Sequence, residues 1–157
     1  MRIAKTGCLL LFTLIFVNGC TAPPPDEVST PTAPQITPAG PEVTSTEPFI
    51  TTDSGLKYRI LREGDGEAPT PADTVLCHYR GWLDDGTQFD SSYGREPFRC
   101  SPGGGIIDGW KEGLQLVHEG GMIELEIPYD LGYGEDGYST IPPYATLHFT
   151  MELIEIL

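Results

Sequence analysis

Residues 134–147 read GEDGYSTIPPYATL, and two shorter stretches precede them: DGTQFDSS at residues 85–92 and IIDGWKEG at residues 106–113. Each stretch is weakly diagnostic by itself, because glycine, proline and acidic residues occur in the turns of many folds. Their order along the chain, together with the apolar pattern between them, carries more information.

Apolar residues alternate with polar ones in four segments, residues 56–60, 75–80, 123–127 and 147–153. Successive side chains of a strand point to opposite faces, so each segment has one apolar face and one wetted face. This pattern is typical of an antiparallel sheet that is covered on one side. Tyr79 and Phe149 fall on the covered face.

One short helix is expected to cover the sheet. Asp108 is placed to cap its first turn, because a carboxylate there can accept from free backbone N–H groups. Trp110, Leu114 and Val117 share one helical face, and glycines 120 and 121 would end the helix. The sequence therefore predicts an α+β fold.

The first twenty residues have the features of an export signal. Arg2 and Lys5 supply positive charge, and the apolar run that follows, residues 8–17, is too short for a permanent membrane span. We therefore predict a signal peptide at residues 1–19 that is removed from the mature protein.

The end of this signal, residues 17–20 (VNGC), resembles the lipobox of bacterial lipoproteins. The resemblance implies lipid attachment at Cys20. With Thr21 next, it further implies an outer-membrane protein that faces the periplasm of a Gram-negative cell. Ordinary cleavage near Ala22, which would give a soluble secreted or periplasmic protein, is the alternative.

Residues 20–48 are predicted to form a disordered linker. Eight prolines occur between residues 21 and 48, and no lysine, arginine or aromatic residue accompanies them before Phe49. Such a segment cannot bury enough apolar surface to offset the entropy of ordering. One globular domain, residues 49–157, remains.

The formal net charge of −14 argues against a nucleic-acid partner, because it repels phosphate. The four cysteines, at positions 8, 20, 77 and 100, have no zinc-ligand spacing, and the acidic turns lack the spacing of a calcium loop. No phosphate loop or nucleophile elbow occurs either. We predict no metal and no cofactor.

In their order and spacing, the three opening stretches resemble the FKBP-type peptidyl-prolyl isomerases. The resemblance covers roughly residues 50–157 and implies a bent antiparallel sheet wrapped around one short helix. It also implies a proline-binding pocket. The implied catalytic residues are Tyr79, Asp90, Trp110, Tyr133 and Phe149, and the implied substrate-binding residues are Phe89, Phe98, Ile106, Ile107 and Ile141.

The resemblance assigns roles to these side chains. Trp110 would be the floor under the prolyl ring, the Ile107 N–H and the Tyr133 hydroxyl would bind substrate carbonyls, and Asp90 would orient Tyr79. A plain aromatic core is the alternative interpretation of the same rings. For Asp90, a turn-closing carboxylate is the alternative.

The implied function is peptidyl-prolyl isomerisation of exported or envelope polypeptides. A binding or chaperone module with the same fold and no catalysis is the alternative. Because the linker cannot supply the long helix through which several family members dimerise, a monomer is expected.

The sequence departs from the family pattern near the pocket rim. Cys100 stands where the family usually has phenylalanine, and the segments 98–110 and 137–142 are each about one residue short. We expect these changes at the pocket rim to alter the binding of macrolide inhibitors. The strands that hold Cys77 and Cys100 run side by side in the family, which implies a Cys77–Cys100 disulfide in an exported protein. Two separate thiols are the alternative.

Overall fold

The computed structural model describes residues 45–157. The predicted signal peptide, the predicted lipid attachment at Cys20 and linker residues 20–44 lie outside the described residues. The elements in chain order are β1 (Ile50–Thr51), β2 (Lys57–Arg62), β3 (Val75–Leu83), β4 (Gln88–Ser91), β5 (Phe98–Cys100), α1 (Asp108–Leu114), β6 (Met122–Ile127), the 3-10 helix η1 (Tyr129–Leu131) and β7 (Leu147–Ile156).

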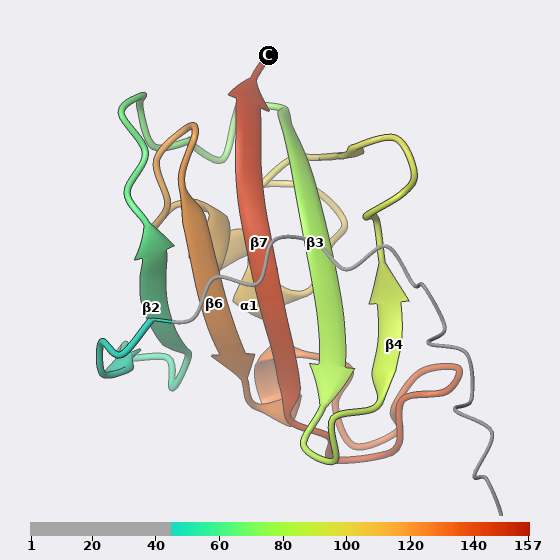
Figure 1. The fold of residues 1–157 in the computed structure, drawn as a ribbon. Helices are drawn as coiled ribbons and strands as arrows, with labels where there is room; N and C mark the ends of the chain where they lie inside the picture. The colour runs from blue at the N-terminus through green and yellow to red at the C-terminus, as the bar shows by residue number, and fades with distance from the viewer. Residues whose placement is uncertain (1–44) are drawn as a thin grey trace, which may run out of the picture. The chain divides into compact units, whose positions relative to one another are not determined.

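The strands form one sheet in the order β1-β2-β6-β7-β3-β4, and β5 pairs with β3 beside this path. All of these pairings are antiparallel. The long strands β3 and β7 pair at the centre, as Figure 1 shows. The four segments with alternating polarity lie in β2, β3, β6 and β7, so the prediction of a sheet from this pattern is confirmed.

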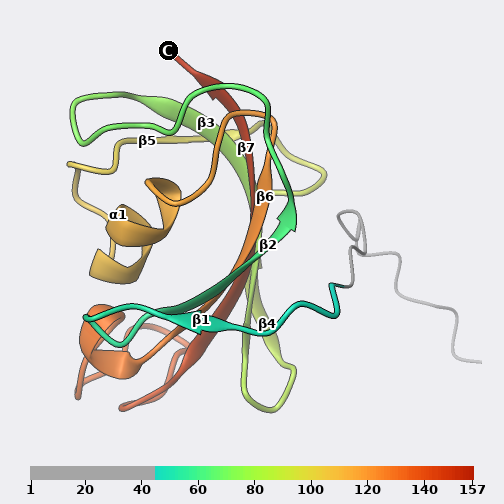
Figure 2. The same ribbon diagram turned by 90° about the vertical axis from the view of Figure 1, so that its left-hand side faces the viewer.

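The sheet is strongly curved, and α1 lies on its concave side (Figure 2). The core between them is built from the inward residues of β3, β6 and β7 and from Trp110, Leu114 and Val117. The predicted α+β architecture, a bent sheet around one short helix, is therefore confirmed. Within residues 45–157, no helix has the length and apolar character needed to cross a bilayer.

Two details of the helix prediction are wrong. Ile107 is the N-cap residue and offers no side-chain acceptor, whereas Asp108 is already in the first turn. The Asp108 carboxylate accepts from Lys111 Nζ at 2.8 Å, so it pairs along the helix and does not cap it. The helix ends at Leu114, well before glycines 120 and 121.

Glycine lets α1 approach the sheet closely. A Cβ atom at Gly109 would lie 2.5–3.0 Å from three side-chain atoms of Ile127, and one at Gly113 would lie 2.5 Å from Leu125 Cδ1. Ile127 and Leu125 are fully buried in β6, so neither has free space to move into. The two glycines therefore set the depth at which Trp110, between them, sits over the sheet.

We predict that Gly109→Ala lowers the free energy of unfolding by about 1–3 kcal/mol through overpacking, although alanine has the higher helix propensity. Ile127 is β-branched and cannot rotate aside cheaply. Gly105→Ala is the matched control, because nothing lies within 4 Å of a Cβ atom there. Urea denaturation of both variants measures the effect, and equal midpoints would contradict the close-approach argument.

The outer, convex face of the sheet is polar and carries the start of the described chain. Arg59 pairs with Glu124 across β2 and β6 at 2.7 Å. It also donates to the Ser45 carbonyl at 3.0 Å, and its guanidinium lies 4.6 Å from the Phe49 ring centroid. Residues 45–49 are thus held on the side of the sheet opposite α1 (Figure 2).

Candidate active site

A cavity of about 620 Å³ lies between α1, the concave face of the sheet and the loop that follows η1. Its walls come from distant parts of the sequence: Tyr79 from β3, Asp90 from β4, Phe98 from β5, Trp110 from α1 and Phe149 from β7. Eight of the ten residues that the resemblance implied line it, namely Tyr79, Asp90, Phe98, Ile106, Ile107, Trp110, Tyr133 and Phe149.

The aromatic rings of the cavity meet edge to face. The Trp110 ring centroid lies 4.9 Å from that of Tyr79, 5.1 Å from that of Phe149 and 6.0 Å from that of Phe98. The interplanar angles of these pairs are 75° to 84°. This arrangement is favourable for aromatic rings and leaves an apolar hollow above the indole, where the alternative interpretation required a filled core.

Phe89 and Ile141, the other two implied residues, do not line the cavity. The Phe89 ring packs against Phe149 at 5.4 Å, and both rings cover Gly81 so closely that a Cβ atom there would lie 2.6–2.8 Å from them. Ile141 is buried, and its backbone exchanges hydrogen bonds with Tyr138. Both residues therefore support the walls from behind.

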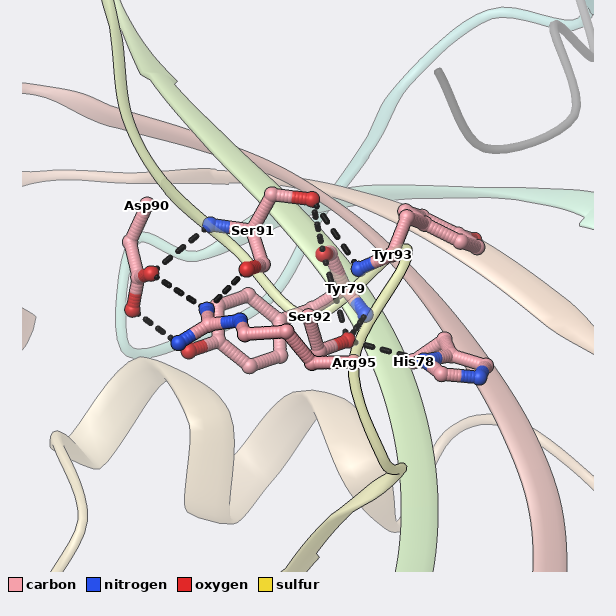
Figure 3. Close-up of polar contacts among 7 residues, drawn as sticks. All are labelled: His78, Tyr79, Asp90, Ser91, Ser92, Tyr93 and Arg95. Atoms are coloured by element: carbon pink, nitrogen blue, oxygen red, sulfur yellow. Dashed lines mark hydrogen bonds and ion pairs between the residues drawn. The ribbon is translucent and has the colours of Figure 1, made fainter. Parts of the chain in front are cut away.

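A polar network closes one side of the cavity (Figure 3). The Tyr79 hydroxyl donates to Asp90 Oδ2 at 2.5 Å, and Arg95 Nη2 donates to Asp90 Oδ1 at 2.9 Å. The Ser91 N–H also donates to Oδ1, at 2.8 Å. Three donors thus fix one carboxylate, and that carboxylate fixes the Tyr79 ring.

The second half of this network holds the strand that carries Tyr79. The buried Ser92 Oγ accepts from the Tyr79 N–H at 2.8 Å and lies 3.0 Å from His78 Nδ1 (Figure 3). The His78 ring in turn stacks on Tyr93 at 5.1 Å. Asp90 therefore holds the side chain of Tyr79, and Ser92 holds its backbone.

The network also sets protonation states. Partial burial opposes ionisation of Asp90, but the hydrogen bonds from Tyr79, Ser91 and Arg95 prevail and lower its pKa below the ordinary aspartate value. Burial first, and then the hydrogen bond to Asp90, raises the pKa of Tyr79 above the ordinary tyrosine value. Near neutral pH the site therefore contains an aspartate anion and a neutral phenol.

These directions predict a flat pH profile for any activity of this cavity between about pH 5 and about pH 9. Asp90 stays ionised until the pH falls below its ordinary range, and Tyr79 stays protonated until the pH rises above its own. The stability that ionised Asp90 contributes is lost only as the pH falls through its lowered folded pKa. Steady-state kcat/KM across this range tests the prediction, and a bell-shaped curve centred within it would contradict it.

Several residues at the site were not predicted as site residues, namely the cavity-lining Gly105, Asp108, Gly132 and Tyr138, and Arg95 beside them. Tyr138 lines the cavity with 65% of its surface exposed, and its ring stacks on Tyr133 at 5.2 Å. Tyr138 lay within the quoted stretch at residues 134–147, so its position was a usable signal. Arg95 had none, because its role depends on the fold of the loop between β4 and β5.

Some polar groups of residues that line the cavity donate no recorded hydrogen bond within residues 45–157. Trp110 Nε1 is buried and has no hydrogen-bond partner among the described residues. The Ile107 carbonyl accepts from the N–H groups of Trp110 and Lys111, whereas the Ile107 N–H donates no loop or cap hydrogen bond within residues 45–157. In the same region, no group of three or more His, Cys, Asp or Glu side chains is placed to hold a metal ion.

Residues 65–154 match the family model described as FKBP-type peptidyl-prolyl cis-trans isomerase. The chain belongs to this family. The expected FKBP-like fold is confirmed by solved structures. The crystal structure of FkpA from Escherichia coli superposes with a TM-score of 0.66 at 45% identity, over 69% of this chain and 51% of that one. The crystal structure of AtFKBP13 gives 0.65 at 33% identity, over 70% of this chain and 99% of that one.

Curated FKBP relatives are similar in sequence over the same region. The FKBP-type peptidyl-prolyl cis-trans isomerase FkpA of Escherichia coli K12 is 47% identical over 109 residues, which cover 68% of this chain. The FKBP-type 22 kDa peptidyl-prolyl cis-trans isomerase of the same strain is 47% identical over 108 residues. The aligned regions span 39% and 52% of these two relatives, so this chain matches only about two fifths to one half of their length.

Proposed function

We propose that this protein accelerates cis–trans isomerisation of Xaa-Pro bonds in polypeptides. The observation that carries the proposal is the open aromatic cavity with Trp110 as its floor. FKBP-type membership supports it, and so do the names of the relatives, which are isomerases.

The chemistry of the cavity suits this reaction. Rotation about a prolyl amide has a barrier of about 18–20 kcal/mol, because the planar bond has partial double-bond character. The twisted transition state has lost this resonance and is less polar than the planar amide. An apolar hollow therefore favours the twisted state over the ground state, and only such differential binding accelerates the reaction.

Each side chain has a role that follows from its place. The prolyl ring would lie on Trp110, between Tyr79, Phe98 and Phe149. The ring centroids of the contacting pairs among these four residues are 4.9–6.3 Å apart. The Ile107 N–H and the Tyr133 hydroxyl would hold substrate carbonyls on either side. Asp90, ionised and held by Arg95, would keep the Tyr79 ring in place and polarise the region around the rotating carbonyl.

We further propose that the protein acts on exported polypeptides from a lipid anchor at Cys20, on the periplasmic side of the outer membrane, with residues 20–48 as a spacer. The signal-like start, residues 17–20 and the proline-rich composition support this. We also propose that the protein is a monomer. Cys100 and the shortened segments 98–110 and 137–142 would change how the rim of the pocket binds macrolide inhibitors.

The test is an isomerisation assay with the full chain on a short Xaa-Pro peptide, followed by NMR exchange spectroscopy so that no protease is needed. We expect the cis-to-trans rate to rise in proportion to protein concentration. A rate equal to that of the uncatalysed peptide, with the peptide still bound, would identify a binding module and end the proposal of catalysis. Detergent-phase partitioning of wild type against Cys20→Ser tests the anchor separately.

A further inference from the structure

Two cysteines lie in the paired strands β3 and β5, close in sequence to the cavity residues Tyr79 and Phe98. In the β3–β5 register, Cys77 is opposite Phe98 and Cys100 is opposite Val75, so the cysteines are diagonal neighbours. Both are free thiols in the structure, and the implied disulfide stays a prediction. They are near enough that each thiol affects the ionisation of the other.

We propose that Cys77 and Cys100 form a reversible redox site, in which a disulfide between β3 and β5 shifts Phe98 and so changes the cavity. The effect on catalysis rests on the proposed isomerase function, whereas the formation of the bond does not. The structure then represents the reduced form.

The two thiols have unequal roles in this oxidation. Cys77 is fully buried, whereas Cys100 is partly exposed. The contact with Cys77 lowers the pKa of Cys100, although burial opposes this, and the same contact, together with burial, raises the pKa of Cys77. Since the thiolate is the nucleophile, Cys100 reacts first.

The oxidant is a small disulfide, and the exchange balances in two steps. The Cys100 thiolate attacks one sulfur of the disulfide, forms a mixed disulfide and releases the other half as a thiolate. The Cys77 sulfur then attacks the Cys100 sulfur, and the second half leaves with the Cys77 proton. Two protein thiols are oxidised by two electrons, and one disulfide is reduced to two thiols.

Geometry connects this bond to the cavity. A disulfide requires Cβ atoms about 3.8 Å apart, whereas diagonal neighbours in an antiparallel pair are about 7–8 Å apart between Cα atoms and somewhat closer between Cβ atoms. Bonding must therefore draw the two strands together. Strand β5 is three residues long and pairs with β3 beside the main sheet, so it is the strand that moves.

Movement of β5 reaches the cavity through one residue. Phe98 begins β5, and its carbonyl accepts from Cys77 Sγ at 3.7 Å, a contact that oxidation removes. Its ring is 39% exposed and meets Tyr79 and Trp110 at 5.7 Å and 6.0 Å. The oxidised form should therefore lose part of one wall, which we expect to lower kcat/KM by about threefold to tenfold, the range given by one aromatic contact.

The bond itself is tested by peptide mapping of the full chain. The protein is equilibrated with oxidised or reduced glutathione, alkylated and cut with trypsin, which separates Cys77 in residues 63–80 from Cys100 in residues 100–111. We expect one linked peptide pair after oxidation and two alkylated peptides after reduction. Alkylation of both cysteines under oxidising conditions, or glutathione left on Cys100, would overturn the proposal.

The shift of Phe98 is tested without reference to catalysis. The chain has two tryptophans, so its NMR spectrum has two indole N–H signals, which Trp82→Phe assigns. Oxidation should move the Trp110 signal and leave the Trp82 signal in place, and Cys100→Ser should abolish this response. An unmoved Trp110 signal in protein with the linked peptide would overturn the link between bond and cavity.

Activity is measured on the same samples. An active protein whose kcat/KM is equal in both redox forms would also contradict this link. An inactive reduced protein would instead contradict the proposed isomerase function, and the peptide map and the indole signals would still decide the redox site.

Discussion

Replacing Trp110 with alanine should lower kcat/KM for an Xaa-Pro peptide by about 10- to 150-fold. The indole is the floor of the cavity and is only 5% exposed, so its removal takes away the apolar surface on which the prolyl ring would lie. Burial of an aliphatic group the size of the prolyl ring is worth about 1.5–3 kcal/mol. Each 1.36 kcal/mol changes the rate tenfold. Steady-state kinetics at several peptide concentrations measure the loss.

The same change should lower the free energy of unfolding by about 3–5 kcal/mol, as is typical for loss of a buried aromatic residue. Kinetics must therefore be measured where circular dichroism shows the variant still folded. Trp110→Phe is the matched control, because it keeps a smaller aromatic floor and loses the pyrrole ring with its N–H, which is unpaired within residues 45–157. Full activity in folded Trp110→Ala would remove the cavity from the mechanism.

Asp90→Val should lower kcat/KM by about 10- to 150-fold, the range expected for loss of a hydrogen bond to a charged group worth about 1.5–3 kcal/mol. The substitution leaves the Tyr79 hydroxyl without its acceptor and the Arg95 guanidinium without its carboxylate. The Tyr79 ring, which packs against Trp110 and Phe98, then loses the contact that fixes its orientation. Comparison with Asp90→Asn separates the carboxylate charge from the acceptor oxygen.

A double-mutant cycle distinguishes whether Asp90 acts by holding Tyr79 or acts on the substrate directly. If Asp90 acts by holding Tyr79, then Tyr79→Phe and Asp90→Val together should cost little more than Asp90→Val alone, because the two changes break one hydrogen bond. Strictly additive losses would mean that Asp90 acts on the substrate directly. Unchanged kcat/KM in Asp90→Val would support the other interpretation, a carboxylate that only closes a turn.

The parts of this molecule that the sequence predicted are those set by repeating local patterns. Period-two alternation defines β2, β3, β6 and β7, because every inward residue of these strands has the same environment. The prediction of the helix N-terminus failed because it depends on a single contact. The Asp108 carboxylate binds Lys111 and does not cap the helix. The end of the helix at Leu114 likewise depends on packing, since no glycine or proline occurs at residues 114–119.

The candidate site likewise contains residues that the sequence predicted and residues whose role depends on the folded structure. Asp90 and Trp110 lie within the quoted stretches, whereas the wall residues Tyr79, Phe98 and Phe149 lie outside them and were assigned only through the family resemblance that the stretches carry. Arg95 escaped notice because its contact with Asp90 exists only once the β4–β5 loop has folded. Phe89 and Ile141 sit within the diagnostic stretches, yet they pack one layer behind the surface that a ligand would touch, a distinction that needs three dimensions.

The attachment of residues 45–49 to the convex face separates them from the cavity. Arg59 holds Ser45 and Phe49 on that face, whereas the cavity lies on the concave face with α1. A polypeptide bound above the indole would therefore not compete for space with residues 45–49.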